Sequence, residues 1–175
     1  EEEEGAQTQS PFSILSEDIL QYAALGEILL VGDFNARTQS RQCEMYDWEV
    51  PDILQAIVPE EVGLGRISAD TGSDSTRYGS HLLALGSAHH LMIYNGMSRW
   101  PESGGYTCFQ KGGKKGQSTV DYILGSLTAM DTVSSFIIPR RPIGADHTYL
   151  SLSLRTSLPT SPPPTHLPHT TIHFT

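Results

Sequence analysis

The segment that most constrains the fold is the apolar run 28–31 (Ile-Leu-Leu-Val), which is followed at once by Gly32-Asp33-Phe34-Asn35. A short apolar run that ends in turn-forming residues is typical of a buried strand. Because side chains alternate along a strand, Asp33 and Asn35 are predicted to point the same way at its carboxyl end. A plainer interpretation stays open, in which both residues only form the turn that ends the strand.

A helix is predicted directly before this strand. Apolar residues recur at spacings of three and four over residues 12–25, as they do on one face of an amphipathic helix. Residues 16–18 (Ser-Glu-Asp) are suited to cap its start, and Gly26 to end it. A helix that leads into a strand indicates a layered α/β fold.

The rest of the chain is predicted to form one domain over residues 11–155, between an acidic leader (1–10) and a Pro/Ser/Thr/His-rich tail (156–175), both of them disordered. Residues 36–77 are expected to be irregular. The other predicted elements are a helix over 78–88, a strand over 91–94 with a turn at Asn95-Gly96, a hairpin of strands 105–110 and 118–125, and strands over 132–138 and 147–154.

Charge and composition limit which partners and which cellular environment we expect for this chain. A net charge of −9 and a pI near 5.1 argue against nucleic-acid binding through bulk positive charge. The one dense basic cluster, residues 111–115, fits either a solvated hairpin loop or a loop that contacts phosphate. Cys43 and Cys108 lack metal-type spacing, which favours a reducing compartment. No apolar run approaches the ~20 residues of a membrane span.

Two later segments carry further candidate chemistry: Ser118-Thr119-Val120-Asp121-Tyr122 and Ala145-Asp146-His147. Asp is disfavoured inside strands, so its place among apolar neighbours at position 121 is costly unless it has a partner. The alternatives are an exposed Asp on an edge strand and a polar Asp-His turn. Carboxylates that hold a divalent cation, together with an oriented His, can hydrolyse a phosphodiester.

In this order, the three motifs resemble the second half of the endonuclease/exonuclease/phosphatase family, whose metal-dependent members cleave phosphoester bonds. The resemblance covers roughly residues 12–154. It implies part of a four-layered α/β/β/α sandwich of the DNase I-like type, with the N-terminal half of the domain missing from this sequence. Exposed sheet edges and an uncovered apolar sheet face would follow.

The resemblance also implies a role for each site residue. Asp33 would align or deprotonate the attacking water, and Asn35 would contact the phosphate. Asp121 would hydrogen-bond the catalytic imidazole of His147. Asp146 would bind Mg²⁺ or Mn²⁺, weakly, because the family's metal-binding Glu belongs to the missing half. Ala145 stands where the family usually has Ser, a change that removes a hydroxyl and no ligand.

Details of the motifs are most similar to the endonuclease domains of non-LTR retrotransposons, which implies a DNA substrate and, for such a retroelement enzyme, a nuclear location. Two alternatives remain. The same scaffold could act as a phosphomonoesterase or lipid phosphodiesterase, which the acidic balance favours, or the chain could be a non-catalytic remnant or interaction module. The residues that carry this subgroup likeness are Asn35-Ala36-Arg37-Thr38, Ile93-Tyr94-Asn95-Gly96 and Tyr106-Thr107.

Overall fold

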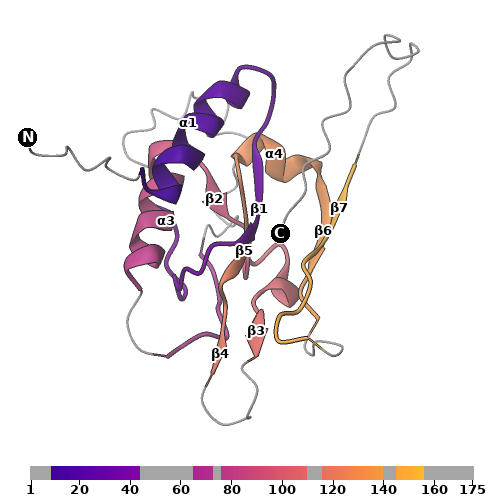
Figure 1. Ribbon diagram of the computed structural model, residues 1–175. Coiled ribbons are helices and arrows are strands. Elements are labelled where there is room, and N and C mark those ends of the chain that lie inside the picture. Colours follow the sequence, from indigo (N-terminus) through magenta and orange to yellow (C-terminus); the bar gives the residue numbers. More distant parts are fainter. Residues whose placement is uncertain (1–8, 44–64, 73–75, 110–115, 140–144, 156–175) are drawn as a thin grey trace, which may run out of the picture.

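A computed structural model describes residues 9–43, 65–72, 76–109, 116–139 and 145–155. Within these ranges the fold is mixed α/β, with three α-helices and small antiparallel sheets (Figure 1). The helices are α1 (Pro11–Ala23), α3 (Arg77–Ala88) and α4 (Leu127–Thr132), with a 3₁₀ turn η1 (Pro101–Ser103). The strands are β1 (Leu29–Asp33), β2 (Met92–Ile93), β3 (Cys108–Phe109), β4 (Gln117–Ser118), β5 (Asp121–Gly125), β6 (Val133–Ile137) and β7 (Ser151–Leu154).

The central sheet has the strand order β1-β5-β2, and both neighbours pair with β5 in the antiparallel sense. The register of β1 against β5 runs from Leu29 opposite Gly125 to Asp33 opposite Asp121. Phe34 continues the ladder by donating its N–H to the Val120 oxygen at 3.0 Å. The pairing therefore brings two carboxylates of the predicted site to the same end of the sheet.

Alternating side chains on the central sheet supply two separate cores. On one face, Tyr122 and Leu124 of β5 pack with residues of α1 and α3. On the other face, Ile123 packs with residues of β6 and α4. The order of layers is therefore helices α1 and α3, the central sheet, then the β6–β7 sheet, as Figure 1 shows from left to right.

A second set of backbone pairings carries the segment that contains His147. β3 pairs with β4 on one side, and Cys108 forms a bridge with His147 on the other. Around this bridge the Phe109 N–H donates to the Asp146 oxygen at 2.6 Å, and the Thr148 N–H donates to the Thr107 oxygen at 2.8 Å. These bonds fix residues 146–148 beside β3 before the chain enters β7.

The predicted first helix is confirmed, and it begins one residue before the expected range, but its cap and its end differ from the prediction, because it ends at Ala23. Ser10 caps α1 by accepting the Ser13 N–H, and Pro11 occupies the first turn, where its missing N–H costs nothing. Residues 16–18, which were expected to cap the helix, lie inside it and are wrong as a cap. Only Ile19 of the apolar face is fully buried, while Tyr22 and Leu25 are exposed.

The predicted hairpin of strands 105–110 and 118–125 is confirmed only near its loop, where β3 pairs with β4, and is wrong beyond residue 118. β4 ends at Ser118 and a new strand, β5, begins at Asp121, so that β3 pairs with β4 while β5 joins the central sheet. Thr107 causes the division, because its Oγ1 accepts the N–H groups of Val120 and Asp121 at 3.0 and 3.1 Å. The short helix α4, capped by Ser126, was also not predicted.

Several sequence predictions fall on residues outside the described ranges: the leader 1–8, part of the 36–77 segment, the basic cluster 111–115 and the tail 156–175. Both cysteines are described, and both are free thiols. None of the helices in the described ranges combines the length and the apolar character that a bilayer crossing requires.

Candidate active site

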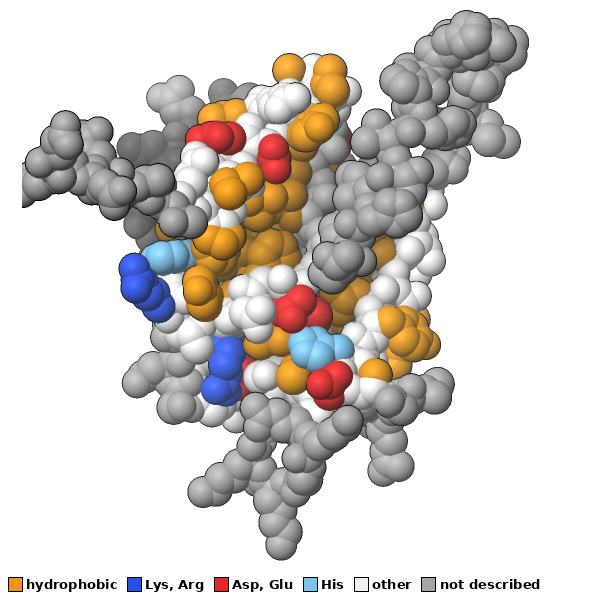
Figure 2. Space-filling model, viewed as in Figure 1, with side chains coloured by type: hydrophobic (Ala, Val, Ile, Leu, Met, Phe, Trp, Pro, Cys, Tyr) orange, Lys and Arg blue, Asp and Glu red, His pale blue; other side chains and the backbone are white. Residues whose placement is uncertain are grey.

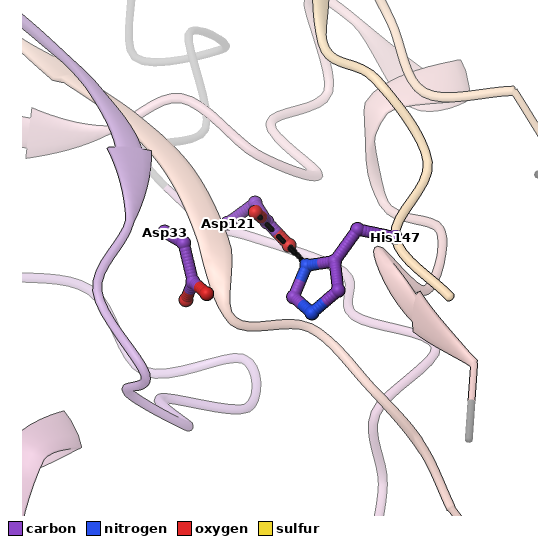
Figure 3. A group of neighbouring side chains, drawn as sticks. All are labelled: Asp33, Asp121 and His147. Atoms are coloured by element: carbon purple, nitrogen blue, oxygen red, sulfur yellow. Dashed lines mark hydrogen bonds and ion pairs between the residues drawn. The ribbon is translucent and has the colours of Figure 1, made fainter. Parts of the chain in front are cut away.

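The candidate site lies where β1 and β5 end. Asp33 closes β1 and Asp121 opens β5, so their Cα atoms are direct partners in the ladder. Like charges directly opposite each other in a sheet repel, which makes this pairing unfavourable without a compensating group. Figure 3 shows both carboxylates and the His147 ring close together, with Asp121 next to the ring.

Asp33 combines a turn-forming role with an accessible carboxylate. Its Oδ1 accepts the backbone N–H of Asn35 at 2.8 Å, which is an Asx turn. Its Oδ2 has no hydrogen-bond partner in the described part of the chain, and the residue is exposed. The plainer interpretation of this motif as a turn is therefore correct in geometry, and it leaves one oxygen of Asp33 open to solvent.

Asn35 is not on the strand, so the alternation argument does not apply to it. β1 ends at Asp33, and Asn35 adopts φ = 48°, in the left-handed region that Asn tolerates better than most residues. Asn35 is exposed next to the cluster, and its predicted contact with phosphate stays a prediction.

Asp121 has the partners that its place in a strand requires. Burial raises the pKa of its carboxyl above the ordinary value, and the charge of Asp33 adds to that rise. Hydrogen bonds from the Thr107 hydroxyl and from His147, with the charge of His147, act in the opposite direction. Its side chain is only 13% exposed, so most of its interactions are with the protein.

His147 faces Asp121 through Nδ1, which lies 3.0 Å from Oδ2 and 3.3 Å from Oδ1. With an ionised Asp121, Nδ1 carries the proton and donates it to the carboxylate, which leaves Nε2 as the reactive nitrogen. The His147 side chain is 36% exposed. The carboxylate thus fixes the tautomer while the ring stays accessible to a ligand.

Asp33, Asp121 and His147 together form the cluster that could hold a cation: each offers one ligand atom, and these three atoms lie within 4.8 Å of one another. Two carboxylates suit a hard divalent cation, and His accepts Mn²⁺ more readily than Mg²⁺. The donor set therefore fits the predicted cation in type. A cation here would also offset the repulsion between the two facing carboxylates.

Asp146, the predicted metal ligand, lies outside this cluster of three. Its backbone oxygen pairs with Phe109, and its side chain is exposed. Burial raises the pKa of the Cys108 thiol, and the charges of Asp121, Asp146 and Asp33 add to that rise. Asp146 directly precedes His147 in the chain, and its role as a ligand stays a prediction.

Sequence reasoning noted Thr107 only as part of a resemblance and missed its structural role. Its side chain is fully buried, and its hydroxyl and carbonyl bind the β5 segment and residue 148 respectively. It also missed Asp70, whose buried carboxylate pairs with Arg37. A usable signal was present, because the polar residues Arg66, Ser68 and Asp70 alternate in a segment that we expected to be irregular.

On the surface, acidic and histidine side chains gather at the end of the central sheet, beside apolar side chains that extend toward α1 (Figure 2). No protein-family model matches this chain, and neither does any curated protein or solved structure. The case for a function therefore depends on the residues and their geometry.

Proposed function

We propose that this chain carries the site of a metal-dependent phosphodiester hydrolase that acts on DNA, as an endonuclease of retroelement type. The observation that carries the proposal is the Asp121–His147 pair, with Nδ1 3.0 Å from the carboxylate, within 4.8 Å of the open carboxylate of Asp33. A carboxylate-oriented imidazole next to a second, accessible carboxylate suits proton transfer at a phosphoester.

Each residue has a distinct task in this proposal. Asp33 accepts a proton from the attacking water through the oxygen that the Asx turn leaves open. His147, held in one tautomer by Asp121, exchanges a proton or donates a hydrogen bond at the phosphate through Nε2. Asn35 binds a phosphate oxygen next to Asp33. Asp146 is the carboxylate that would hold Mg²⁺ or Mn²⁺ beside the cluster of Asp33, Asp121 and His147, and the cation would supply charge stabilisation.

The proposal extends to the fold. The helix–sheet–sheet order of layers supports assignment to a four-layered α/β/β/α sandwich, in which one further helical layer would cover the outer face of the β6–β7 sheet. That outer face carries the exposed Ile137, which such a layer would bury.

The experiment is nicking of supercoiled plasmid by the purified chain, with Mg²⁺, with Mn²⁺ and with chelator. We expect cation-dependent nicking that His147→Ala abolishes. His81→Ala is the matched control, because His81 packs against Phe12 and is not part of the cluster. Nicking that survives in His147→Ala, or in chelator, would contradict the proposal.

A substrate panel separates the related activities. Bis(p-nitrophenyl) phosphate and p-nitrophenyl phosphate report diester and monoester hydrolysis, and an inositol phospholipid in vesicles reports lipid cleavage. Turnover of the monoester or the lipid without DNA nicking would replace the nuclease with a phosphatase or lipid phosphodiesterase. A folded chain that turns over none of these substrates would be non-catalytic.

A further inference from the structure

Residues Arg66–Asp70, which we call the strap, bury their polar and charged side chains and expose an apolar one. Arg66, Ser68 and Asp70 are 5%, 7% and 2% exposed, whereas Ile67 between them is 78% exposed. Burying charged groups is costly unless they are paired and hydrogen-bonded. The inverted pattern therefore indicates that the inward polar groups contribute something that an apolar strap could not.

Asp70 connects the two strand ends that carry the site. Its carboxylate accepts Nε and Nη2 of Arg37, at 2.9 Å for Nε, and also accepts the Thr119 N–H at 3.2 Å. Arg37 follows Asp33 by four residues along the chain, and Thr119 precedes Asp121 by two. One buried carboxylate thus joins the segment after β1 to the segment before β5.

Arg66 makes a second connection between the same regions. Its guanidinium donates to the oxygens of Asn95 at 2.7 Å and Arg41, and to Oγ1 of Thr38 at 3.2 Å. The Asn95 side chain in turn donates to the Asp121 oxygen at 3.1 Å. Arg66 therefore binds the loop after Asn35 and, through one intermediary, the backbone of Asp121.

Tyr122 completes the network between the strap and the site. Its hydroxyl accepts both the N–H and the hydroxyl of Thr38, and donates to the Thr119 oxygen at 2.7 Å. The Arg66 guanidinium lies over the Tyr122 ring, 5.8 Å from its centroid. Within the described residues, no hydrogen bond joins the strap to Asp33, to His147 or to the Asp121 carboxylate.

We propose that the strap is the positioning element of the Asp33–Asp121–His147 cluster, with Asp70 and Arg66 as positioning residues that hold the ends of β1 and β5 in register. This inference rests on the proposed function for its catalytic consequence. Its structural part, that the strap sets the order of the two strand ends, can be tested without any activity.

The test compares Asp70→Asn with Asp131→Asn in the full chain. Asp131 forms the exposed Arg99–Asp131 ion pair at 3.1 Å, which gives a matched control away from the site. Hydrogen exchange is followed at the Phe34 and Asp121 amides, which bond to Val120 and Thr107, and at the Tyr94 amide in the core. We expect exchange at Phe34 and Asp121 to be about tenfold faster in Asp70→Asn, because a buried charged hydrogen bond is lost, with Tyr94 unchanged. Asp131→Asn should change none of the three.

The activity arm measures kcat and KM for cleavage of a DNA duplex. Asp70→Asn is expected to lower kcat about tenfold with KM unchanged, because the cluster is loosened while its ligand groups remain. Equal acceleration of all three amides, or no acceleration, would overturn the inference, and so would an unchanged kcat. If Asp70→Asn does not fold, Arg37→Gln breaks the same pair from its partly exposed side.

The two proposals fail separately. A wild-type chain that cleaves nothing contradicts the proposed function, and exchange at Phe34 and Asp121 then still decides whether the strap orders the strand ends. A wild-type chain that cleaves DNA, with Asp70→Asn equal to it in both arms, leaves the function standing and removes the positioning role.

Discussion

The cluster and the strap are two groups of charged residues that the fold treats in opposite ways. In the cluster, Asp33 is exposed and keeps an oxygen without a described partner, and the His147 side chain is 36% exposed. In the strap, Arg66 and Asp70 are almost fully buried, and each side chain makes three hydrogen bonds within the protein. No buried side-chain polar atom in the described residues lacks a partner. Burial lowers the pKa of Arg66 to about 10, which leaves it charged at neutral pH.

This difference separates side chains that are free to react or to bind a ligand from side chains that stabilise the fold. A side chain whose hydrogen-bonding capacity is already used contributes rigidity, and its removal is expected to cost stability. A side chain with open capacity contributes little to stability and is free to bind a ligand. The predictions below test this division, and they run from the largest expected effect to the smallest.

The largest effect is expected at Asp33. Asp33→Ala should reduce the rate of plasmid nicking by about 10²–10⁴-fold, the usual contribution of a general base. The unfolding free energy of this variant should fall by no more than about 1 kcal/mol, since the exposed side chain loses only the hydrogen bond from the Asn35 N–H. Nicking and urea denaturation of the same preparations measure both, with Asp131→Ala as the exposed carboxylate control.

Arg66 should show the reverse pattern in stability. Arg66→Leu removes the donors to Asn95, Arg41 and Thr38, and should lower the unfolding free energy by about 3 kcal/mol. Arg99→Leu, which breaks the exposed pair with Asp131, should cost less than about 1 kcal/mol. Equal losses in urea denaturation would show that burial does not distinguish the strap from the surface.

Two glycines, Gly79 and Gly32, test how tightly the protein packs around the segment that carries Asp33 and the loop after it. A Cβ at Gly79 in α3 would clash with the backbone oxygen of Arg37, whereas a Cβ at Gly32 would meet nothing within 4 Å. Gly79→Ala should therefore cost about 1–3 kcal/mol from overpacking. Gly32→Ala should cost less than about 0.5 kcal/mol, as an open site allows. Thermal unfolding measures the stability of the two variants. If Gly79→Ala is as stable as wild type, the backbone at Arg37 moves to make room for the added methyl group.

The smallest effect is expected for Asp121→Asn, whose stability relative to wild type should increase with pH. A carboxyl whose pKa is raised in the folded state stabilises the fold fully below its unfolded pKa, and this contribution is lost as pH rises through the folded pKa. The raised pKa of Asp121 therefore predicts that Asp121→Asn becomes more stable relative to wild type as the pH rises above about 4, the ordinary pKa of an Asp carboxyl. Thermal unfolding with chelator present measures the difference. A gap that narrows as pH rises would contradict the assigned cause.

Much of this arrangement could be predicted from local sequence. The apolar run before Gly32 predicted β1, and periodicity predicted α1 and α3, because each pattern needs only one buried face. The sequence motifs also brought forward Asp33, Asp121 and His147, which the fold places together although 88 and 26 residues separate the successive members.

The predictions that were wrong, and the features that were missed, depend mostly on contacts between residues that are distant in the sequence. Thr107 divides the expected strand 118–125 through hydrogen bonds that no local pattern announces. Both Ser10 and the acidic segment 16–18 have side chains suited to cap a helix. Only the observed start of α1 shows that Ser10 is the cap. The pairing of Arg37 with Asp70 joins residues 33 positions apart, so neither could be recognised as a partner from its own neighbourhood.

The most direct test of the account is a double-mutant cycle between Asp121 and His147 in plasmid nicking. Rates are measured for wild type, Asp121→Ala, His147→Ala and the double variant at one Mg²⁺ concentration. If the two residues act as one unit, the double variant is no slower than the slower single variant. Rate losses that multiply in the double variant, or a cation-dependent rate that neither substitution changes, would contradict the claim that this pair is the centre of the site.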